Sequence, residues 1–145
     1  MLALIIGDTL YLANTGDSRA LLSVDSGREV IQLTNDHKPT DPIEQNRILM
    51  NGGQIYQNTQ ISMRPSEQVN VMLGPHRVFP GRLSVSRTIG DIEAKAEHLT
   101  GNPKIVISDP DITVVKLEKK HDFLVLACDG IFDKLDDKEA VHFVW

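Results

Sequence analysis

Short apolar runs separated by turn residues dominate the first part of the chain. The runs span residues 2–6, 10–13, 20–24 and 30–33. Glycine, aspartate and asparagine fill the gaps between them, and these residues favour turns. Connections this short favour hairpins over crossover helices. The pattern therefore predicts an antiparallel meander of strands over residues 2–34.

Two helices are predicted from capping patterns. Asp41 is followed three residues later by Glu44, and the proline between them suits the first helical position. The paired glycines at 52–53 end this helix. Asp136 and Glu139 repeat the capping pattern near the end of the chain, where they predict a last helix.

The middle of the chain has a different composition. Residues 54–82 are polar and rich in proline and glycine, which predicts a long, mobile loop with room for a short strand. Loops of this length are unusual in compact domains and are often functional. After it, we expect a short helix within residues 83–91 and strands over residues 105–107 and 112–117.

The most informative run of the sequence is Phe123–Asp133. Its first five residues are apolar, which predicts a strand buried on both faces, followed by Cys128 as a small buried residue. Asp129 ends the strand, and Asp133 stands four positions later. A carboxylate over an apolar floor is costly unless it is paired or bound to a metal. The two aspartates therefore indicate a site for a hard cation such as Mg²⁺ or Mn²⁺.

A second strand ends in a similar way. The run 10–13 leads into an Asn-Thr-Gly-Asp turn that carries Asp17. If the two strands lie together, Asp17, Asp129 and Asp133 converge as one metal site. The alternative is structural, because an aspartate after a strand commonly forms a turn or caps a helix. In that case Asp17 pairs with an arginine, either Arg19 or Arg87.

Composition narrows the classes of function. The 145 residues, 41% hydrophobic and 24% charged, suit one globular domain over residues 1–145. The net charge of −5 and the lack of a basic block argue against nucleic-acid binding. No apolar run is long enough for a membrane span. A single cysteine excludes an internal disulfide framework and favours an intracellular setting, in the cytoplasm or nucleus. The apolar ends suggest a domain that is incomplete at both ends.

Six segments, taken in order, resemble one known family. The chain is similar to the metal-dependent type 2C protein phosphatases, which act on phosphoserine and phosphothreonine. The matching segments are residues 10–20, 33–39, 44–48 together with the glycines at 52–53, 82–91, 110–111 and 123–133. Each segment alone is weakly informative, whereas six in the family's order are specific.

The resemblance implies an α+β fold, an antiparallel β-sandwich flanked by helices. It also implies that Asp129 binds a dinuclear Mg²⁺ or Mn²⁺ centre and that Asp129, Asp133 and Asp17 hold a further metal. Residues 54–82 correspond to the family's flap. The implied reaction is hydrolysis of a phosphoprotein by a metal-activated water, so Cys128 is not needed as a nucleophile. A monomer is expected.

The chain departs from the family pattern in two places. The Asp-Gly-His-Gly segment, which supplies a bridging metal ligand and a general-acid histidine, does not occur in it, and no Asp-Asn metal segment occurs either. No complete catalytic set is therefore expected among these residues, and the 145 residues alone are expected to be inactive. Two functions stay open: part of an active serine/threonine phosphatase, or a non-catalytic, phosphatase-like binding module with one weak cation site.

Overall fold

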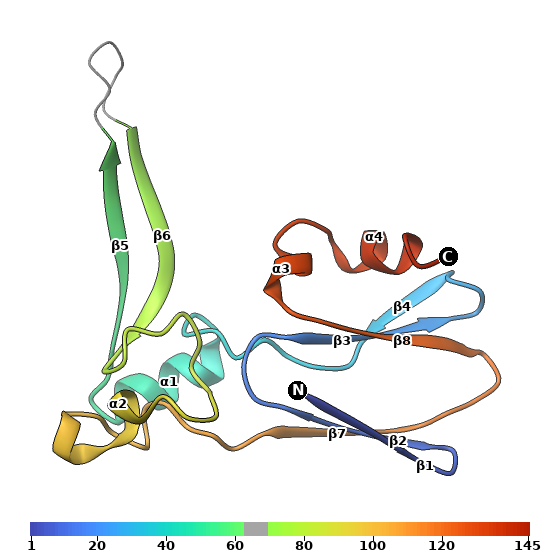
Figure 1. Ribbon diagram of the computed structural model, residues 1–145, viewed down its shortest axis with the longest axis horizontal. Helices are drawn as coiled ribbons and strands as arrows, with labels where there is room; N and C mark the ends of the chain where they lie inside the picture. Colours follow the sequence, from blue (N-terminus) through green and yellow to red (C-terminus); the bar gives the residue numbers. More distant parts are fainter. Residues whose placement is uncertain (63–69) are drawn as a thin grey trace. The chain divides into compact units, whose positions relative to one another are not determined.

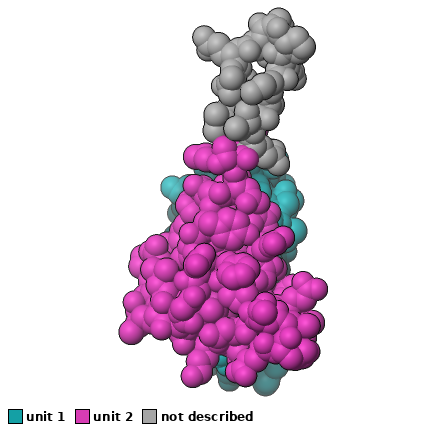
Figure 2. All heavy atoms as spheres, turned by 90° about the vertical axis from the view of Figure 1, so that its left-hand side faces the viewer, with its two compact units in different colours: residues 1–36, 109–145 teal, residues 37–108 magenta. Residues whose placement is uncertain are grey.

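A computed structural model describes residues 1–62 and 70–145, with side chains omitted for residues 60–71. The chain forms two compact units (Figure 2). One unit contains residues 1–36 and 109–145, and the other contains residues 37–108. The organisation of residues 1–145 as a single domain stays a prediction.

The first unit is a sandwich of two antiparallel sheets (Figure 1). One sheet has the order β1-β2-β7, formed by β1 (Leu2–Ile6), β2 (Thr9–Asn14) and β7 (Asp111–Lys116). The other has the order β4-β3-β8, formed by β4 (Glu29–Gln32), β3 (Arg19–Val24) and β8 (His121–Ala127). Two helices follow β8, namely α3 (Asp129–Phe132) and α4 (Asp137–His142). The predicted α+β class is confirmed.

Two apolar layers hold this unit together. Leu10, Leu12 and Ala20 are buried between the two sheets, with Leu124 packed against them. Leu21 faces the other way and is buried against α4. Strand β3, the central strand of its sheet, therefore has apolar partners on both of its faces.

The predicted meander over residues 2–34 is wrong in its topology. Strands β1 with β2 and β3 with β4 form hairpins as expected, but β2 and β3 belong to different sheets. Because β3 needs an apolar layer on each face, it cannot simply extend the sheet of β2. The connection over residues 15–18 therefore crosses from one sheet to the other.

The outer face of the β1-β2-β7 sheet is apolar and exposed in the described chain. The side chains of Leu2, Leu4, Ile6, Tyr11 and Ile112 line a shallow hollow of about 330 Å³ on this face. Both faces of these strands are therefore apolar. This explains why the sequence shows continuous apolar runs there rather than the alternation of a half-solvated strand.

Strand β8 is less buried than expected. Phe123, Leu124 and Val125 are only partly buried, and Leu126 is 47% exposed. Cys128, which we expected to be buried, is exposed. The physical reason is that β8 lies at the edge of its described sheet, whereas the apolar run suggested a central strand.

The second unit contains a short helix, a long hairpin and two further helical turns. Its elements are α1 (Pro42–Met50), β5 (Gln54–Ser62), β6 (Asn70–Phe79), α2 (Ile92–Lys95) and the 3₁₀ helix η1 (Glu97–Leu99). Its core is formed by Ile48, Val78, Ala94, Ile105 and Val106. Asp41 caps α1 as predicted, by accepting hydrogen bonds from the backbone of Ile43 and Glu44.

The predicted loop over residues 54–82 is wrong, because β5 and β6 pair as an antiparallel hairpin. The part of that prediction at residues 63–69 lies outside the described residues. Pro75 argued against a strand, since proline cannot donate a ladder hydrogen bond. The register shifts between Gln57 and Thr59, on the strand opposite Pro75, and this irregularity accommodates the proline.

The predicted helix at 83–91 and strand at 105–107 are also wrong. The backbone N–H of Val78 donates to the carbonyl of Leu83, and that of Thr88 donates to the carbonyl of Ile107. Residues 83–88 therefore bond to distant segments and not to a helical ladder. Single bridges replace the expected strand.

In the part of the chain that the structure describes, no helix is long and apolar enough to cross a membrane.

A large effect on stability is expected at the centre of the sandwich. Leu10 is fully buried between the sheets, so Leu10→Ala removes apolar contacts and leaves a cavity. We expect the free energy of unfolding to fall by about 2–5 kcal/mol in urea denaturation. Leu4→Ala is the control, because Leu4 lies on the adjacent strand and is 49% exposed. An equal loss in both variants would contradict the described core.

Candidate metal site

The strand pair β3–β8 places two of the predicted ligands at one end of the sandwich. Its last aligned pair joins Arg19 and Ala127. Asp17 lies two residues before Arg19, and Asp129 lies two residues after Ala127. Because the strands are antiparallel, both aspartates leave the same end of the pair. This end of the strand pair therefore carries both Asp17 and Asp129.

Asp129 and Asp133 are linked by the short helix α3. Asp129 is its first residue, and the backbone N–H of Asp133 donates to the carbonyl of Asp129 at 2.8 Å. Residues four apart on a helix lie on one side of it. Both side chains are exposed. The pair can therefore present two carboxylates to the same volume of solvent.

A buried asparagine fixes the turn that carries Asp17. Asn14 ends β2 and is 1% exposed. Its Nδ2 donates to the carbonyls of Gly16 and Asn35, each at 3.1 Å. Gly16 has a φ of 116°, a value that residues with a side chain rarely adopt. The turn between the sheets is therefore held in a defined conformation, with Asp17 half-buried.

Arg19 connects this turn to the segment around Asp133. Its Nε and Nη2 donate to the two carboxylate oxygens of Asp36 at 2.8 and 2.9 Å, and its Nη1 donates to Asp137 at 3.0 Å. The guanidinium also lies 5.1 Å from the ring centroid of Phe132. Hydrogen bonds with Asp36 outweigh burial and raise the pKa of Arg19 further. Arg19 thus acts as a positioning residue for the α3–α4 segment.

The chemistry of these donors fits a hard cation, since Mg²⁺ and Mn²⁺ prefer carboxylate oxygens. The structure brings Asp129 and Asp133 to one helical turn and places Asp17 at the same end of the strand pair. Over residues 1–62 and 70–145, no three His, Cys, Asp or Glu side chains are grouped closely enough to hold a metal. The convergence of the three carboxylates therefore stays a prediction.

A second charged cluster lies in the unit formed by residues 37–108. The carboxylate of Glu44 is 2% exposed and accepts a hydrogen bond from Arg87 Nη2 at 2.7 Å. Ser86 Oγ donates to Glu44 at 2.5 Å, and Arg47 Nη1 donates to it at 2.7 Å. Arg47 also donates to the carbonyl of Ile105. Glu44 therefore joins α1 to residues 86–87, and Arg47 joins the same helix to residue 105.

Two opposing effects set the pKa of Glu44. Burial raises it, but hydrogen bonds from Arg87, Ser86 and Arg47 outweigh burial and lower the pKa from 4.5 to about 2. The predicted role of Glu44 in a capping box is wrong, because its side chain is turned into this cluster. The capping box at Asp136 and Glu139 is confirmed, with both reciprocal hydrogen bonds formed.

Comparison with known proteins agrees with the family resemblance of the sequence. The sequence model of the family described as Protein phosphatase 2C matches residues 1–145. A relative from Paramecium tetraurelia, named probable protein phosphatase 2C 6, is 34% identical over 98% of this chain and 41% of its own length. Protein phosphatase 2C homolog 2 of Hypocrea jecorina is 39% identical over 97% of this chain and 28% of its own length.

Solved structures show the same fold. A C. elegans protein described as sex determining has a TM-score of 0.71 and 28% identity, over 94% of this chain and 28% of that chain. A serine-threonine phosphatase 2C from Toxoplasma gondii has a TM-score of 0.66 and 24% identity, over 97% of this chain and 43% of that chain. The chain thus spans less than half the length of these relatives. The match over all of residues 1–145 shows that the chain belongs to the protein phosphatase 2C family.

Proposed function

We propose that the protein hydrolyses phosphoserine and phosphothreonine in other proteins and that it uses Mg²⁺ or Mn²⁺. The observation that carries the proposal is the placement of Asp129 and Asp133 on one helical turn at the end of β8, inside a chain that matches the phosphatase family throughout. Asp17 leaves the same end of the strand pair. These three carboxylates are the proposed metal ligands within this chain.

The residues of the chain have separate tasks in this proposal. Asp129, Asp133 and Asp17 hold the metal, which when bound supplies Lewis acidity and lowers the pKa of a coordinated water. Arg19 holds the α3–α4 segment close to the start of β3 through its ion pair with Asp137, and its ion pair with Asp36 fixes the guanidinium. Cys128 is exposed beside this site and is assigned no part in the reaction. We also propose a monomeric protein that works inside the cell.

The direct test is release of inorganic phosphate from a phosphothreonine peptide by the intact protein. We expect turnover in the presence of Mn²⁺ and its loss after chelation with EDTA, regained when Mn²⁺ is added back. A folded protein that shows no metal-dependent turnover would contradict the proposal. If that protein still bound Mn²⁺ in calorimetry, the non-catalytic binding module would be the supported function.

A further inference from the structure

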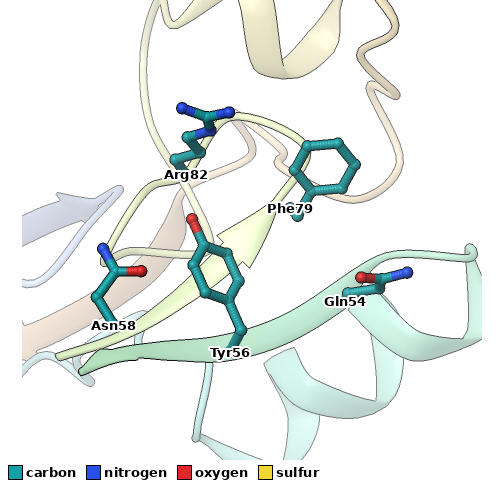
Figure 3. A pocket seen from close by; sticks show the side chains of 5 residues that line it. All are labelled: Gln54, Tyr56, Asn58, Phe79 and Arg82. Atoms are coloured by element: carbon teal, nitrogen blue, oxygen red, sulfur yellow. The ribbon is translucent and has the colours of Figure 1, made fainter. Parts of the chain in front are cut away.

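A hollow lies on one face of the β5–β6 hairpin (Figure 3). Its volume is about 400 Å³, and it is lined by Gln54, Tyr56, Asn58, Phe79 and Arg82. Residues 54, 56 and 58 alternate along β5, so their side chains share one face of the hairpin. Gln54 and Phe79 are aligned across the two strands, which adds Phe79 to the same face. The hollow is therefore a feature of regular strand geometry.

The chain after β6 brings Arg82 over this face and is fixed on two sides. Arg77 Nη1 donates to the carbonyl of Arg82 at 2.7 Å, and Arg77 is itself aligned with Tyr56 across the hairpin. A Cβ on Gly81 would lie 2.4 Å from the Cβ of Ala94, so glycine permits close packing of this turn on α2. Arg82 has a φ of 58°, which is uncommon for a residue with a long side chain. The position of Arg82 is thus imposed by its surroundings.

The polar groups around the hollow suit an anion. Tyr56 points its hydroxyl toward Arg82, and the carboxamides of Asn58 and Gln54 lie on either side (Figure 3). No carboxylate is present among the lining residues, and the described part of the hairpin, residues 54–59 and 72–82, contains no acidic residue. A lining with one positive and no negative side chain stands out in a chain with a net charge of −5. The guanidinium can donate two parallel hydrogen bonds to one oxyanion.

The aromatic ring of Phe79 adds an apolar wall. Phe79 is 45% exposed, so its ring is available to a ligand. An oxyanion on an aliphatic stem would place its charged end on Arg82 and Tyr56 and its stem against Phe79. An acidic side chain of a peptide has this shape, and a bare inorganic anion does not use the ring.

We propose that the face formed by Gln54, Tyr56, Asn58, Phe79 and Arg82 binds an oxyanionic side chain of the phosphoprotein substrate, other than the phosphate that is removed. The oxyanion is a carboxylate or a second phosphate. This inference rests on the proposed phosphatase function for the identity of its ligand. It assigns to the hairpin a preference for acidic substrates.

The test is peptide binding to the intact protein, measured by fluorescence anisotropy so that turnover is not needed. The probes are labelled peptides of one sequence in which alanine replaces the phosphothreonine and the flanking residues are glutamate, glutamine or phosphoserine. We expect the glutamate peptide to bind at least about tenfold more tightly than the glutamine peptide. Tighter binding of the glutamate peptide supports the site. Because phosphoserine is itself a proposed substrate, tighter binding of the phosphoserine peptide supports the site only where Arg82→Gln removes it.

Two variants separate the hollow from general charge attraction. Arg82→Gln keeps the backbone carbonyl that Arg77 binds, and it is expected to abolish the preference for glutamate over glutamine. Lys104→Gln removes an equal charge from an exposed position of the same unit, away from the lining residues, and is expected to keep the preference. An unchanged preference in Arg82→Gln, or an equal loss in both variants, would overturn the proposal.

Tyr56→Phe provides a second measurement that keeps the fold, since it deletes a hydroxyl only. It is expected to weaken binding of the glutamate peptide by a few-fold. In turnover assays, the acidic flanks are expected to lower KM in the wild-type protein but not in Arg82→Gln. Binding that follows these rules in a protein without phosphatase activity would contradict the proposed function and leave this site standing.

Discussion

Replacing Glu44 with glutamine is expected to lower the free energy of unfolding by about 3–5 kcal/mol. Glu44 is the anion on which both Arg47 and Arg87 converge, and its side chain is 2% exposed. Glutamine has the same shape, but it removes the buried negative charge that faces both guanidinium groups. Urea denaturation measures the loss. Glu93→Gln is the matched control, because Glu93 is exposed in the same unit.

The same carboxylate predicts how stability depends on pH. Its pKa is about 2 in the folded protein, compared with an ordinary value of 4.5. A lowered folded-state pKa means that the contribution is present above pH 4.5 and is lost as pH falls toward 2. The wild-type protein should therefore lose stability more steeply than Glu44→Gln over this range. Parallel pH profiles of the two proteins would contradict the assigned role of Glu44.

Replacing Asp129 with asparagine is expected to reduce Mn²⁺ affinity by about tenfold or more, and to reduce turnover by the intact protein by a larger factor. Asparagine keeps the size of the side chain and removes its charge, so the helix α3 can still form. Isothermal calorimetry gives the affinity, and phosphate release from a phosphothreonine peptide gives the turnover. Asp133→Asn is expected to weaken metal binding as well, since it lies one turn away.

The control for both substitutions is Asp8→Asn. Asp8 is exposed in the turn between β1 and β2, where it pairs with Lys116 on the surface. Exposed pairs of this kind contribute little to stability, so the variant is expected to fold and to bind metal normally. Equal Mn²⁺ affinity in Asp129→Asn and Asp8→Asn would show that α3 is not part of the metal site.

The strands of the sandwich were predictable because each is a short apolar run with turn residues at its ends. Their pairing was less accessible. The sequence shows that 10–13 and 20–24 are strands, but it does not show that Leu21 needs a helix on the face opposite Ala20. That requirement, which places β2 and β3 in different sheets, depends on residues more than a hundred positions away in α4.

The hairpin β5–β6 is not predicted by the sequence, because proline and glycine are typical of loops and occur throughout this segment. Pro75 lies where the register shifts, so a strand tolerates it there. The inward turn of Glu44 is likewise not predictable from the local sequence. Its spacing from Asp41 matches a local capping pattern, whereas Arg87 and Ser86, which turn it inward, are more than forty residues away.

The candidate ligands Asp17, Asp129 and Asp133 were accessible from the sequence, since each follows an apolar strand and lies near a glycine. The residues that position them were not. Asn14 and Arg19 reach segments at Asn35 and Asp137 that no local pattern connects to them. Long polar side chains that join distant segments have no period and no fixed spacing, so only the folded structure reveals them.

The crossing of the chain between the two sheets at residues 15–18 has a thermodynamic consequence. Asp17 lies on this crossing, and Asp129 extends from β8 of one sheet. An unfolded chain does not hold these carboxylates together, so a cation bound by both would favour the folded state by mass action. At a free concentration one hundred times its dissociation constant, such a cation adds about 2.7 kcal/mol to the free energy of unfolding. Under the proposed assignment, the cation that serves the reaction also strengthens the association of the two layers of the sandwich.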